Sequence, residues 1–419
     1  MRIPVIVIGA GPAGLAMSHQ LMENGLDHVV LERGEVANSW RIERWDSLRL
    51  LTPNWMSGLP GHRYRGDDPD GFMTASEAAT FLDEYQRTFA APVMTHVAVE
   101  RVERTGQGFE VTTDAGLWQC DAVVAATGAS SEPRIPVLAA EMPKRIEQLT
   151  ALRYRNPSAL AREGSVLVVG ASASGIQIAD ELRRAGRDVT IAIGEHVRLP
   201  RSYRGRDIYW WLDRIGQLDE RYDEVDDIER ARRHASVQLV GSEDHRTLDL
   251  NALSESGVQL VARLVKVIGT TAQFSGALAN LAANADLKQT RLLDRIDAFV
   301  AATAFDGEVF SPLRPPPTRL ATVPTELDLS AFSTVIWATG YRPSYSWLDP
   351  SARDHRGRVA HDGGVADFAG LYLLGLPFMR RRGSNLIGGV GADVADMCTH
   401  LRGYLDVRAR SRGGYSVTR

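Results

Sequence analysis

The chain has 419 residues, of which 44% are hydrophobic and 24% are charged, and its formal net charge is -4 at pH 7. This composition is typical of a globular protein, and the length is that of two or three domains. Because like charges do not cluster in long runs, the sequence argues against nucleic acid as a partner and against a polybasic membrane anchor.

Cysteine usage and apolar runs exclude further classes of protein. Cys120 and Cys398 are the two cysteines, and neither belongs to a C-x-x-C pair or to a spaced Cys/His set. We therefore expect neither a dithiol relay nor a metal site. A predicted strand begins at Arg2, which leaves no room for a signal peptide, and the apolar runs fall short of the about 20 residues of a membrane span. These features predict a cytoplasmic protein with no membrane partner.

The first predicted unit is a strand, a glycine turn and a helix within residues 5–21. An apolar, β-branched run at 5–8 leads directly into GAGPAG at 9–14. In this fingerprint the first glycine permits a tight turn, the second lets the backbone approach a pyrophosphate, and the third lets the helix pack closely. The free N–H groups that begin the helix favour phosphate. The residues predicted to surround that phosphate are Gly9, Gly11, Pro12, Ala13 and Gly14.

A second predicted strand, at 28–31, ends at Glu32 and Arg33. An acid about 20 residues after the glycine turn is the usual partner of a ribose hydroxyl. The unit therefore predicts a site for the adenosine half of a dinucleotide, and its acid suits FAD.

The same arrangement returns in the middle of the chain. An apolar run at 166–169 leads into GASASG at 170–175 and then into a predicted helix at 176–184. Ser172 stands where the middle glycine would be, and serine is small enough for phosphate approach. We call each of these predicted phosphate-binding turns a cradle, the first at 9–14 and the second at 170–175. The residues predicted to form the second cradle are Gly170, Ser172, Ala173, Ser174 and Gly175.

Two arginines follow the next predicted strand. Arg198 and Arg201 lie where an acid would hold an unphosphorylated ribose, and arginine there pairs with a 2′-phosphate. The second cradle is therefore predicted to bind NADP(H). The alternative is that both arginines are ordinary solvated charges.

A repeated tripeptide, Ala-Thr-Gly, ends two apolar runs. Because a Thr-Gly pair lets a chain turn sharply at a strand end, each copy is expected beside a cofactor. We assign Thr127 and Gly128 to FAD, and Thr339 and Gly340 to NADP.

The order of these units predicts an α/β fold with two Rossmann-like dinucleotide-binding domains, the NADP domain inserted into the FAD domain. The expected boundaries are 1–156 for the first part of the FAD domain, 163–310 for the NADP domain with a helical insertion from about 203, and 325–419 for the second part of the FAD domain. The chain would then cross between domains near 155–163 and near 310–330.

With these motifs in view, the sequence resembles the group B flavin-containing monooxygenase superfamily, particularly its short bacterial and YUCCA-type members. The likeness rests on GAGPAG, WRIERWDSLRLLTP at 40–53, ATG followed by two prolines at 126–136, GASASG, and ATGYRP at 338–343. The resemblance implies that NADPH reduces FAD, that O₂ adds at flavin C4a, and that the resulting (hydro)peroxide oxygenates N, S or a carbonyl of a small molecule.

The resemblance also implies residue roles. Val97 would meet the adenine of FAD through its backbone, and Tyr341 and Arg342 would lie where NADP enters. The residues implied to line the flavin are Trp40, Arg41, Leu50 and Thr52. Because the cofactor carries the chemistry, no catalytic side chain is assigned; the candidates are Thr52, Thr74 and Gln148.

The linker at 145–157 departs from the superfamily pattern, since a glycine is absent and Thr150 stands where related sequences carry histidine. This departure favours an alternative function, an NADPH-dependent flavin oxidase or oxidoreductase without a stable peroxide. A redox-sensing flavoprotein is a third hypothesis. The small-molecule substrate is undefined, and a homodimer is the default expectation.

Overall fold

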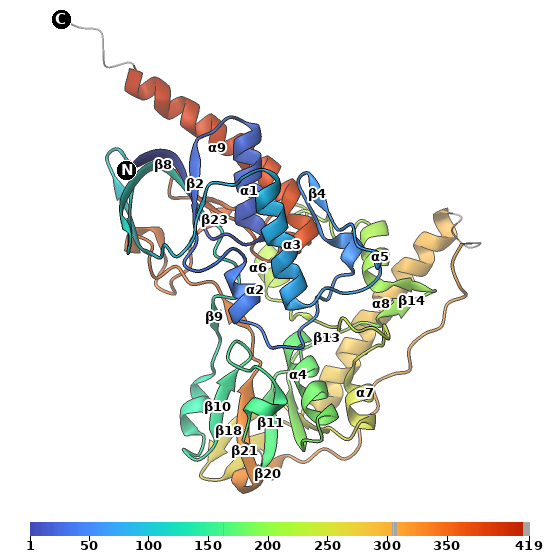
Figure 1. The fold of residues 1–419 in the computed structure, drawn as a ribbon. Coiled ribbons are helices and arrows are strands. Elements are labelled where there is room, and N and C mark those ends of the chain that lie inside the picture. Colours follow the sequence, from blue (N-terminus) through green and yellow to red (C-terminus); the bar gives the residue numbers. More distant parts are fainter. Residues whose placement is uncertain (162, 304, 306–307, 414–419) are drawn as a thin grey trace, which may run out of the picture.

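The computed structural model describes residues 1–161, 163–303, 305 and 308–413. These residues form two α/β domains, one above the other in Figure 1, and the N-terminus lies on the upper domain. The second domain is inserted into the first, which confirms the predicted fold class. Within the described ranges, no helix has the length and apolar character needed to cross a membrane.

The first domain is built on a sheet whose parallel strands have the order β25-β8-β1-β2-β5. Its main elements are β1 (Arg2–Ile8), α1 (Pro12–Glu23), β2 (His28–Leu31), α2 (Asn38–Ile42), β3 (Gly58–Leu59), β4 (His62–Arg63), α3 (Ala75–Thr88), β5 (Val93–Met94), β6 (Val99–Thr105), β7 (Gly108–Thr113), β8 (Gly116–Ala125), β23 (His361–Asp362), β24 (Val365–Ala366), β25 (Leu371–Leu373) and α9 (Val390–Gly413). β1 lies between two parallel neighbours, and its apolar run is buried, as expected for a central strand.

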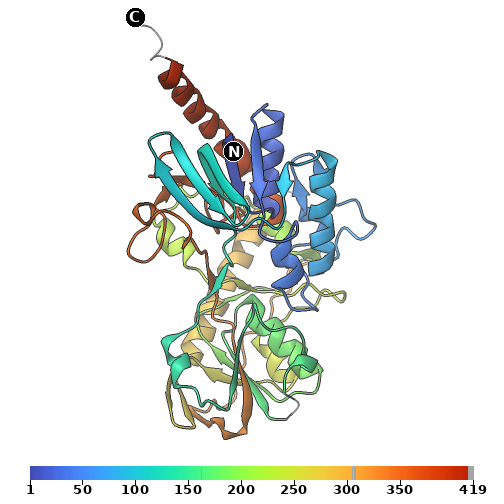
Figure 2. The ribbon, with the colours of Figure 1, turned by 60° about the vertical axis from the view of Figure 1, so that its left-hand side comes forward.

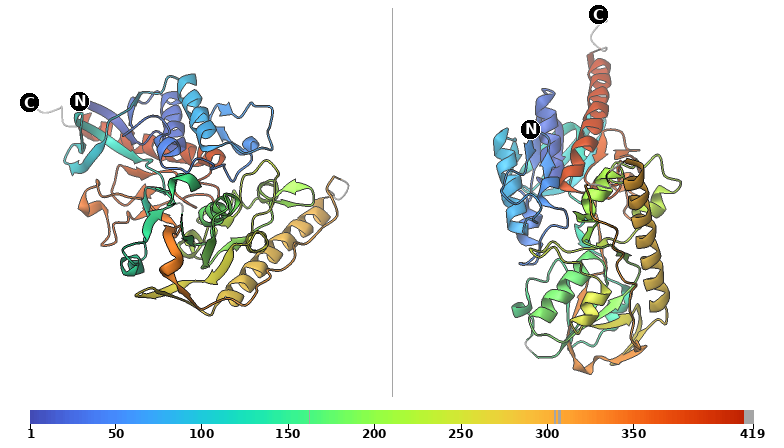
Figure 3. Two further views of the ribbon diagram at one scale, coloured as in Figure 1. Left: turned by 60° about the horizontal axis from the view of Figure 1, so that its bottom comes forward. Right: turned by 90° about the vertical axis from the view of Figure 1, so that its right-hand side faces the viewer.

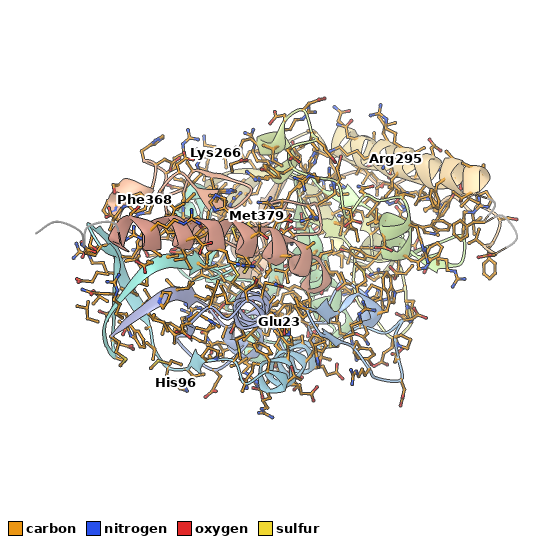
Figure 4. The ribbon with its side chains drawn as sticks, turned by 90° about the horizontal axis from the view of Figure 1, so that it is seen from above. Glu23, His96, Lys266, Arg295, Phe368 and Met379 are labelled. Atoms are coloured by element: carbon orange, nitrogen blue, oxygen red, sulfur yellow. The ribbon has the colours of Figure 1, made fainter. Side chains whose placement is uncertain are left out.

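Helices cover this sheet on one side. α1 packs against α3 and α9, and α9 then projects beyond the body of the domain (Figures 1 and 2). β6, β7 and β8 form an antiparallel meander. In Figure 2 this meander lies on one side of α1, and α3 lies on the opposite side. Seen from above, α9 crosses the first domain, and His96 and Arg295 lie on opposite sides of the molecule (Figure 4).

The second domain repeats this plan with the parallel order β10-β21-β11-β12-β17. Its main elements are β10 (Glu147–Thr150), β11 (Ser165–Val169), α4 (Ala173–Arg184), β12 (Val189–Ile193), β13 (Val197–Arg198), β14 (Ser202–Tyr203), β15 (Arg206–Asp207), α5 (Ile208–Arg214), α6 (Ile228–Arg232), β16 (Val237–Gln238), α7 (Leu250–Glu255), β17 (Gln259–Ala262), β18 (Leu264–Ile268), β19 (Thr271–Phe274), α8 (Leu278–Thr303), β20 (Glu326–Asp328) and β21 (Phe332–Trp337). The order β21-β11-β12-β17 matches β8-β1-β2-β5 in the first domain, so the two cradles sit on equivalent strands.

The segment predicted as an insertion forms a small core of its own. Trp211 of α5 is buried and donates from Nε1 to the Tyr203 carbonyl oxygen at 2.7 Å, and it packs with one face of α8. α8 is one continuous helix that runs along the outside of the molecule beside the second sheet (Figure 3). Of the three consecutive aromatic residues of α5, Tyr209 and Trp211 are therefore core residues and Trp210 is partly buried.

The predicted domain boundaries are corrected by the sheet topology. β10 lies within the predicted first part and β21 within the predicted third part, yet both belong to the second sheet, since β21 pairs with β10 and β11. The crossings are instead β9 (Glu132–Pro133) and β22 (Tyr341–Arg342), which pair antiparallel at the waist of the molecule (Figure 1). The second domain therefore spans about 134–340, because β10 lies before the first predicted crossing and β21 lies after the second.

Candidate functional site

The first cradle has the backbone that its glycines predict. Gly9 has φ of 104°, and its N–H donates to the Leu31 carbonyl oxygen at 2.8 Å. A Cβ on Gly14 would lie 1.9 Å from the Gly9 carbonyl oxygen, so only glycine lets α1 approach the turn this closely. A Cβ on Gly11 would meet no protein atom within 4 Å, because this residue faces open space.

The second cradle repeats this geometry. Gly170 has φ of 112°, and its N–H donates to the Ala192 carbonyl oxygen at 2.9 Å. A Cβ on Gly175 would lie 1.8 Å from the Gly170 carbonyl oxygen. The serine at position 172 leaves this turn unchanged, with φ of -84° against -88° at Gly11.

Both cradles leave the start of their helix open. α3, α5, α6 and α7 each begin at a residue whose side-chain oxygen accepts an N–H of the first turn. Among the described residues, no side chain caps α1 or α4 in this way. Their first N–H groups therefore point unpaired, with the positive end of the helix dipole, at the place where a phosphate would lie.

The repeated Ala-Thr-Gly element packs against each cradle. A Cβ on Gly9 would lie 2.7 Å from the Ala126 carbonyl oxygen, and one on Gly170 would lie 2.3 Å from that of Ala338. β8 and β21 thus each end with a backbone carbonyl against the first glycine of a cradle. The repeat is a structural part of each cradle, which explains why the chain carries it twice.

A cavity of about 550 Å³ opens at the first cradle, within the size range of small-molecule sites. Most residues predicted to hold FAD line it: Gly9, Gly11, Pro12, Ala13, Glu32, Arg33, Trp40, Val97, Thr127 and Gly128. Gly14 lies behind them as a packing residue. The cavity therefore gathers segments from the ends of β1, β2, β5 and β8 at one edge of the sheet.

Glu32, predicted to hold the adenosine ribose, is fixed in the wall of this cavity. Its Oε2 accepts from the Ala10 N–H at 2.8 Å, and its Oε1 accepts from the Gly34 N–H at 3.1 Å. The Glu32 carbonyl in turn accepts from the Val97 N–H at 2.9 Å. Since each carboxylate oxygen has a second lone pair, Glu32 is held in place yet can still accept from ribose hydroxyls.

Next to Trp40, the arginine that lines this cavity is Arg44 rather than Arg41. Arg41 turns away, since its Nε donates to the Val36 carbonyl oxygen at 3.0 Å. The Arg44 guanidinium lies 5.5 Å from the Trp40 ring, and both residues line the cavity. Burial lowers the pKa of Arg44, although Tyr341 and Glu43 oppose this shift. Arg44 lies two residues beyond the end of α2, so helical spacing from Trp40 did not identify it.

Leu50 and Thr52 do not line the cavity; both are buried where the first domain meets the insertion. The Leu50 N–H donates to the Met73 carbonyl oxygen at 2.8 Å, and a Cβ on Gly241 would lie 2.1 Å from the Leu50 carbonyl oxygen. Residues 50–52 therefore contact both the first domain and the insertion.

The opposite end of the cavity lies at the start of α9. Ser384, Asn385, Leu386 and Ile387 line it together with Val390, the first residue of the helix. Asp393 in the first turn is wholly buried, and its Oδ1 accepts from Nη1 of Arg381 at 2.9 Å. Burial raises the pKa of Asp393 even though Ser384 and Arg381 favour its charged form. No motif of the sequence predicted the residues at 384–387.

Near the second cradle, the structure brings Ser174 and Tyr341 together. Their hydroxyl oxygens are 3.3 Å apart, although they lie in α4 and at the domain crossing. The Thr339 hydroxyl donates to the Arg134 carbonyl oxygen, and Gly340 adopts φ of 91°. These predicted NADP residues therefore lie where the crossing strands meet the second cradle.

The prediction that Arg198 and Arg201 bind a 2′-phosphate is wrong. Arg198 is 2% exposed and pairs with Asp249 at 2.6 Å and with Asp286 at 2.7 Å. Arg201 is wholly buried; it pairs with Asp207 at 2.6 Å and donates to the Leu51 carbonyl oxygen at 2.8 Å. Because both guanidinium groups are enclosed by internal acceptors, neither has a face for a ligand phosphate.

The remaining candidate residues have structural contacts. Thr74 caps α3, with its Oγ1 accepting from the Glu77 N–H at 3.2 Å. Gln148 lies on β10, where its amide joins the Ala139 carbonyl oxygen at 3.1 Å and Nε1 of Trp337 at 2.9 Å. Both side chains therefore hold the fold and do not face the cavity.

Comparisons with known proteins agree with this geometry. Residues 6–283 match the family described as pyridine nucleotide-disulphide oxidoreductase. The chain is 34% identical over 395 residues to an uncharacterized oxidoreductase CzcO-like of Geobacillus kaustophilus, covering 94% of this chain and 96% of that protein. It is 29% identical over 217 residues to the indole-3-pyruvate monooxygenase YUCCA6 of Arabidopsis thaliana, covering 48% of this chain and 50% of that protein.

A solved structure supports the fold. The flavin-containing monooxygenase from Stenotrophomonas maltophilia superposes with a TM-score of 0.68 at 22% sequence identity, covering 96% of this chain and 99% of that chain. At this level of identity the likeness concerns the arrangement of the two domains.

Proposed function

Because the chain belongs to the pyridine nucleotide-disulphide oxidoreductase family, we propose that it uses NADPH to reduce a bound FAD and then transfers one oxygen atom from O₂ to a small molecule. The relatives place it in the flavin-containing monooxygenase-like superfamily. It is accordingly a flavin-dependent oxidoreductase with FAD and NADP(H) as cofactors. The proposed reaction converts substrate, NADPH, a proton and O₂ into oxygenated substrate, NADP⁺ and water.

One observation carries this proposal: two cradles with open helix starts stand on equivalent strands of two sheets. A single dinucleotide needs one such cradle, whereas a relay from a hydride donor to a flavin needs two.

The residues of the first cradle fit FAD. The backbone at Gly11 and the first N–H groups of α1 would hold the pyrophosphate, with the Arg44 guanidinium nearby. Glu32 would accept from the adenosine ribose, and Val97 would lie beside the adenine. When bound, FAD supplies the transfer of electrons from NADPH and the reaction with O₂.

The flavin ring would then extend toward 384–387. The positive end of α9 at Val390 faces this part of the cavity, where it favours negative charge on a reduced ring. Asp393, buried one turn into the helix and paired with Arg381, fixes the loop that leads into α9. The chain's own contribution is thus binding, orientation and a shielded electrostatic environment.

The second cradle fits the hydride donor. The first N–H groups of α4 and the hydroxyl of Ser174 would hold the pyrophosphate of NADPH. Tyr341, which contacts Ser174, lies on the crossing strand that leads back to the first domain. This placement supports direct hydride transfer from NADPH at the second cradle to FAD at the first, without a mobile carrier between them.

A second candidate function is direct oxidation of the reduced flavin, in which NADPH, a proton and O₂ give NADP⁺ and H₂O₂. The linker residue Thr150 favours it, because this position carries histidine in the family pattern. Here the Thr150 hydroxyl is buried at the end of β10, and no described residue is its hydrogen-bond partner.

Anaerobic reduction followed by mixing with O₂ separates these functions. We expect NADPH to bleach the FAD-loaded protein, and O₂ to restore the oxidised spectrum through a second absorbing species. With a panel of small amines, sulfides and ketones, at least one compound should lower H₂O₂ formed per NADPH consumed. One H₂O₂ per NADPH with every compound would establish the oxidase instead, and failure of NADPH to bleach the flavin would contradict both.

A further inference from the structure

The matched strand order of the two sheets allows their nucleotide edges to be compared position by position. In the first domain, the residues that follow β2 and β5 are Glu32 and Thr95, which are adjacent because Leu31 pairs with Met94. In the second domain, β12 and β17 are the equivalent strands, and the residues that follow them are Gly194 and Arg263. An acid beside a threonine at one site thus becomes a glycine beside an arginine at the other.

Arg263 lies directly over this glycine. β12 and β17 pair in parallel with Ile193 beside Ala262, so the next residue of each strand is also adjacent. A Cβ on Gly194 would meet only Nε and Nη2 of Arg263, each at 3.6 Å. The guanidinium therefore lies in van der Waals contact with the position where the Cβ of an acid such as Glu32 would stand.

The Arg263 side chain is exposed, and its backbone is fixed by a hydrogen bond from the Ser275 N–H to its carbonyl oxygen at 2.9 Å. In the part of the chain that the structure describes, no carboxylate pairs with this guanidinium. Arg198 and Arg201, by contrast, are buried and paired with carboxylates. Arg263 is accordingly an anchored cation with a free face at the nucleotide edge of the second sheet.

We infer that Arg263 binds the 2′-phosphate of NADPH and makes the second cradle select NADPH over NADH. In a strand–helix–strand unit, the pyrophosphate lies at the helix start and the adenosine ribose lies at the end of the second strand. That end is Gly194, which has no carboxylate to accept from an unphosphorylated ribose. A planar guanidinium there forms charge-assisted hydrogen bonds with a phosphate.

Glu195 is the group that opposes this assignment, because its exposed carboxylate is one residue beyond Gly194. It would repel a 2′-phosphate that came close, and it would favour a free ribose instead. A preference for NADPH would therefore indicate that Arg263 faces the ribose, and a preference for NADH would indicate that Glu195 does.

The inference rests on the proposed function only in that the second cradle binds a nicotinamide dinucleotide. The test is equilibrium titration of the FAD-loaded protein with 2′,5′-ADP and with 5′-AMP, together with anaerobic rates of flavin reduction by NADPH and NADH. Three proteins are compared: the wild type, Arg263→Gln, and Lys266→Gln, which removes a charge from an exposed residue of β18. Melting temperatures verify that all three are folded.

We expect Arg263→Gln to raise the Kd of 2′,5′-ADP about 10- to 100-fold and that of 5′-AMP less than about 3-fold, as for loss of a charge-assisted hydrogen bond. Lys266→Gln should change neither. Gly194→Glu, whose Cβ fits at 3.6 Å from Arg263, should reverse the preference toward NADH.

Equal losses for 2′,5′-ADP and 5′-AMP in Arg263→Gln, or no loss for either, would overturn the assignment. So would a wild-type protein that binds the two nucleotides equally. These results are independent of oxygenation: a chain that only produces H₂O₂ can still lose its NADPH preference in Arg263→Gln, which would support the inference while contradicting the proposed function.

Discussion

Replacing Gly11 with alanine is expected to abolish tight FAD binding and to leave the apoprotein folded. The new methyl group would meet no protein atom within 4 Å, and φ of -88° at this position suits alanine. The methyl group would instead project from the backbone that the pyrophosphate must approach. The substitution should therefore weaken FAD binding without disturbing the fold.

The expected magnitudes follow from this geometry. An alanine at a compatible φ changes the free energy of unfolding by roughly 0.4–1 kcal/mol in the stabilising direction, since the unfolded chain loses entropy. A backbone hydrogen bond to a charged phosphate contributes about 1.5–3 kcal/mol, so losing even one raises the Kd of FAD roughly 10- to 150-fold.

The assay is titration of the apoprotein with FAD, followed by flavin fluorescence, with the melting temperature of the apoprotein measured in parallel. Gly276→Ala is the matched control, because its Cβ also meets nothing within 4 Å but lies between β19 and α8, away from the cavity. The reasoning is refuted if Gly11→Ala binds FAD as the wild type does, or if its loss of affinity is accompanied by an equal loss of stability.

Three further outcomes are expected. Gly175→Ala should prevent stable folding, because its Cβ would lie 1.8 Å from the Gly170 carbonyl oxygen; a melting temperature near that of the wild type would contradict this. Arg198→Ala should lower the free energy of unfolding by about 3–5 kcal/mol, since it strands the buried Asp249, and chemical denaturation should show this without a changed ratio of NADPH to NADH affinity. Burial lowers the pKa of His361 from 6.5 to about 4, so the unfolded chain takes up the proton first as the pH falls. Stability should therefore decrease between pH 6.5 and 4, by about 1 kcal/mol per pH unit at most, and urea unfolding of His361→Gln should show a weaker decrease.

The cradles could be predicted from sequence because their constraints are local. The turn at Gly9, the close packing at Gly14 and the open helix start all arise within six consecutive positions, and the same is true at Gly170. The Ala-Thr-Gly repeat was predicted beside each cofactor, and its carbonyl contact with the first glycine of each cradle explains its recurrence. These features depend little on the rest of the chain.

The arginines and the domain boundaries could not be predicted in this way. Arg198 bonds to acids that lie 51 and 88 positions further along the chain, so its burial is invisible to local spacing. β21 pairs with β10 and β11 rather than with the first sheet, a choice that depends on long-range pairing. Arg263 lies far beyond the second fingerprint in sequence and meets Gly194 only because β17 pairs with β12.

The crossing between the domains has a consequence for how such a protein is assembled and varied. The Arg134 N–H donates to the Gly340 carbonyl oxygen at 2.9 Å, so the polypeptide leaves and re-enters the flavin domain at a single point. Because the two ends of the second domain meet, its about 200 residues could be exchanged for another pyridine-nucleotide-binding domain by rejoining the chain at β9 and β22. Cofactor preference could therefore diversify by recombination while the flavin pocket is inherited intact.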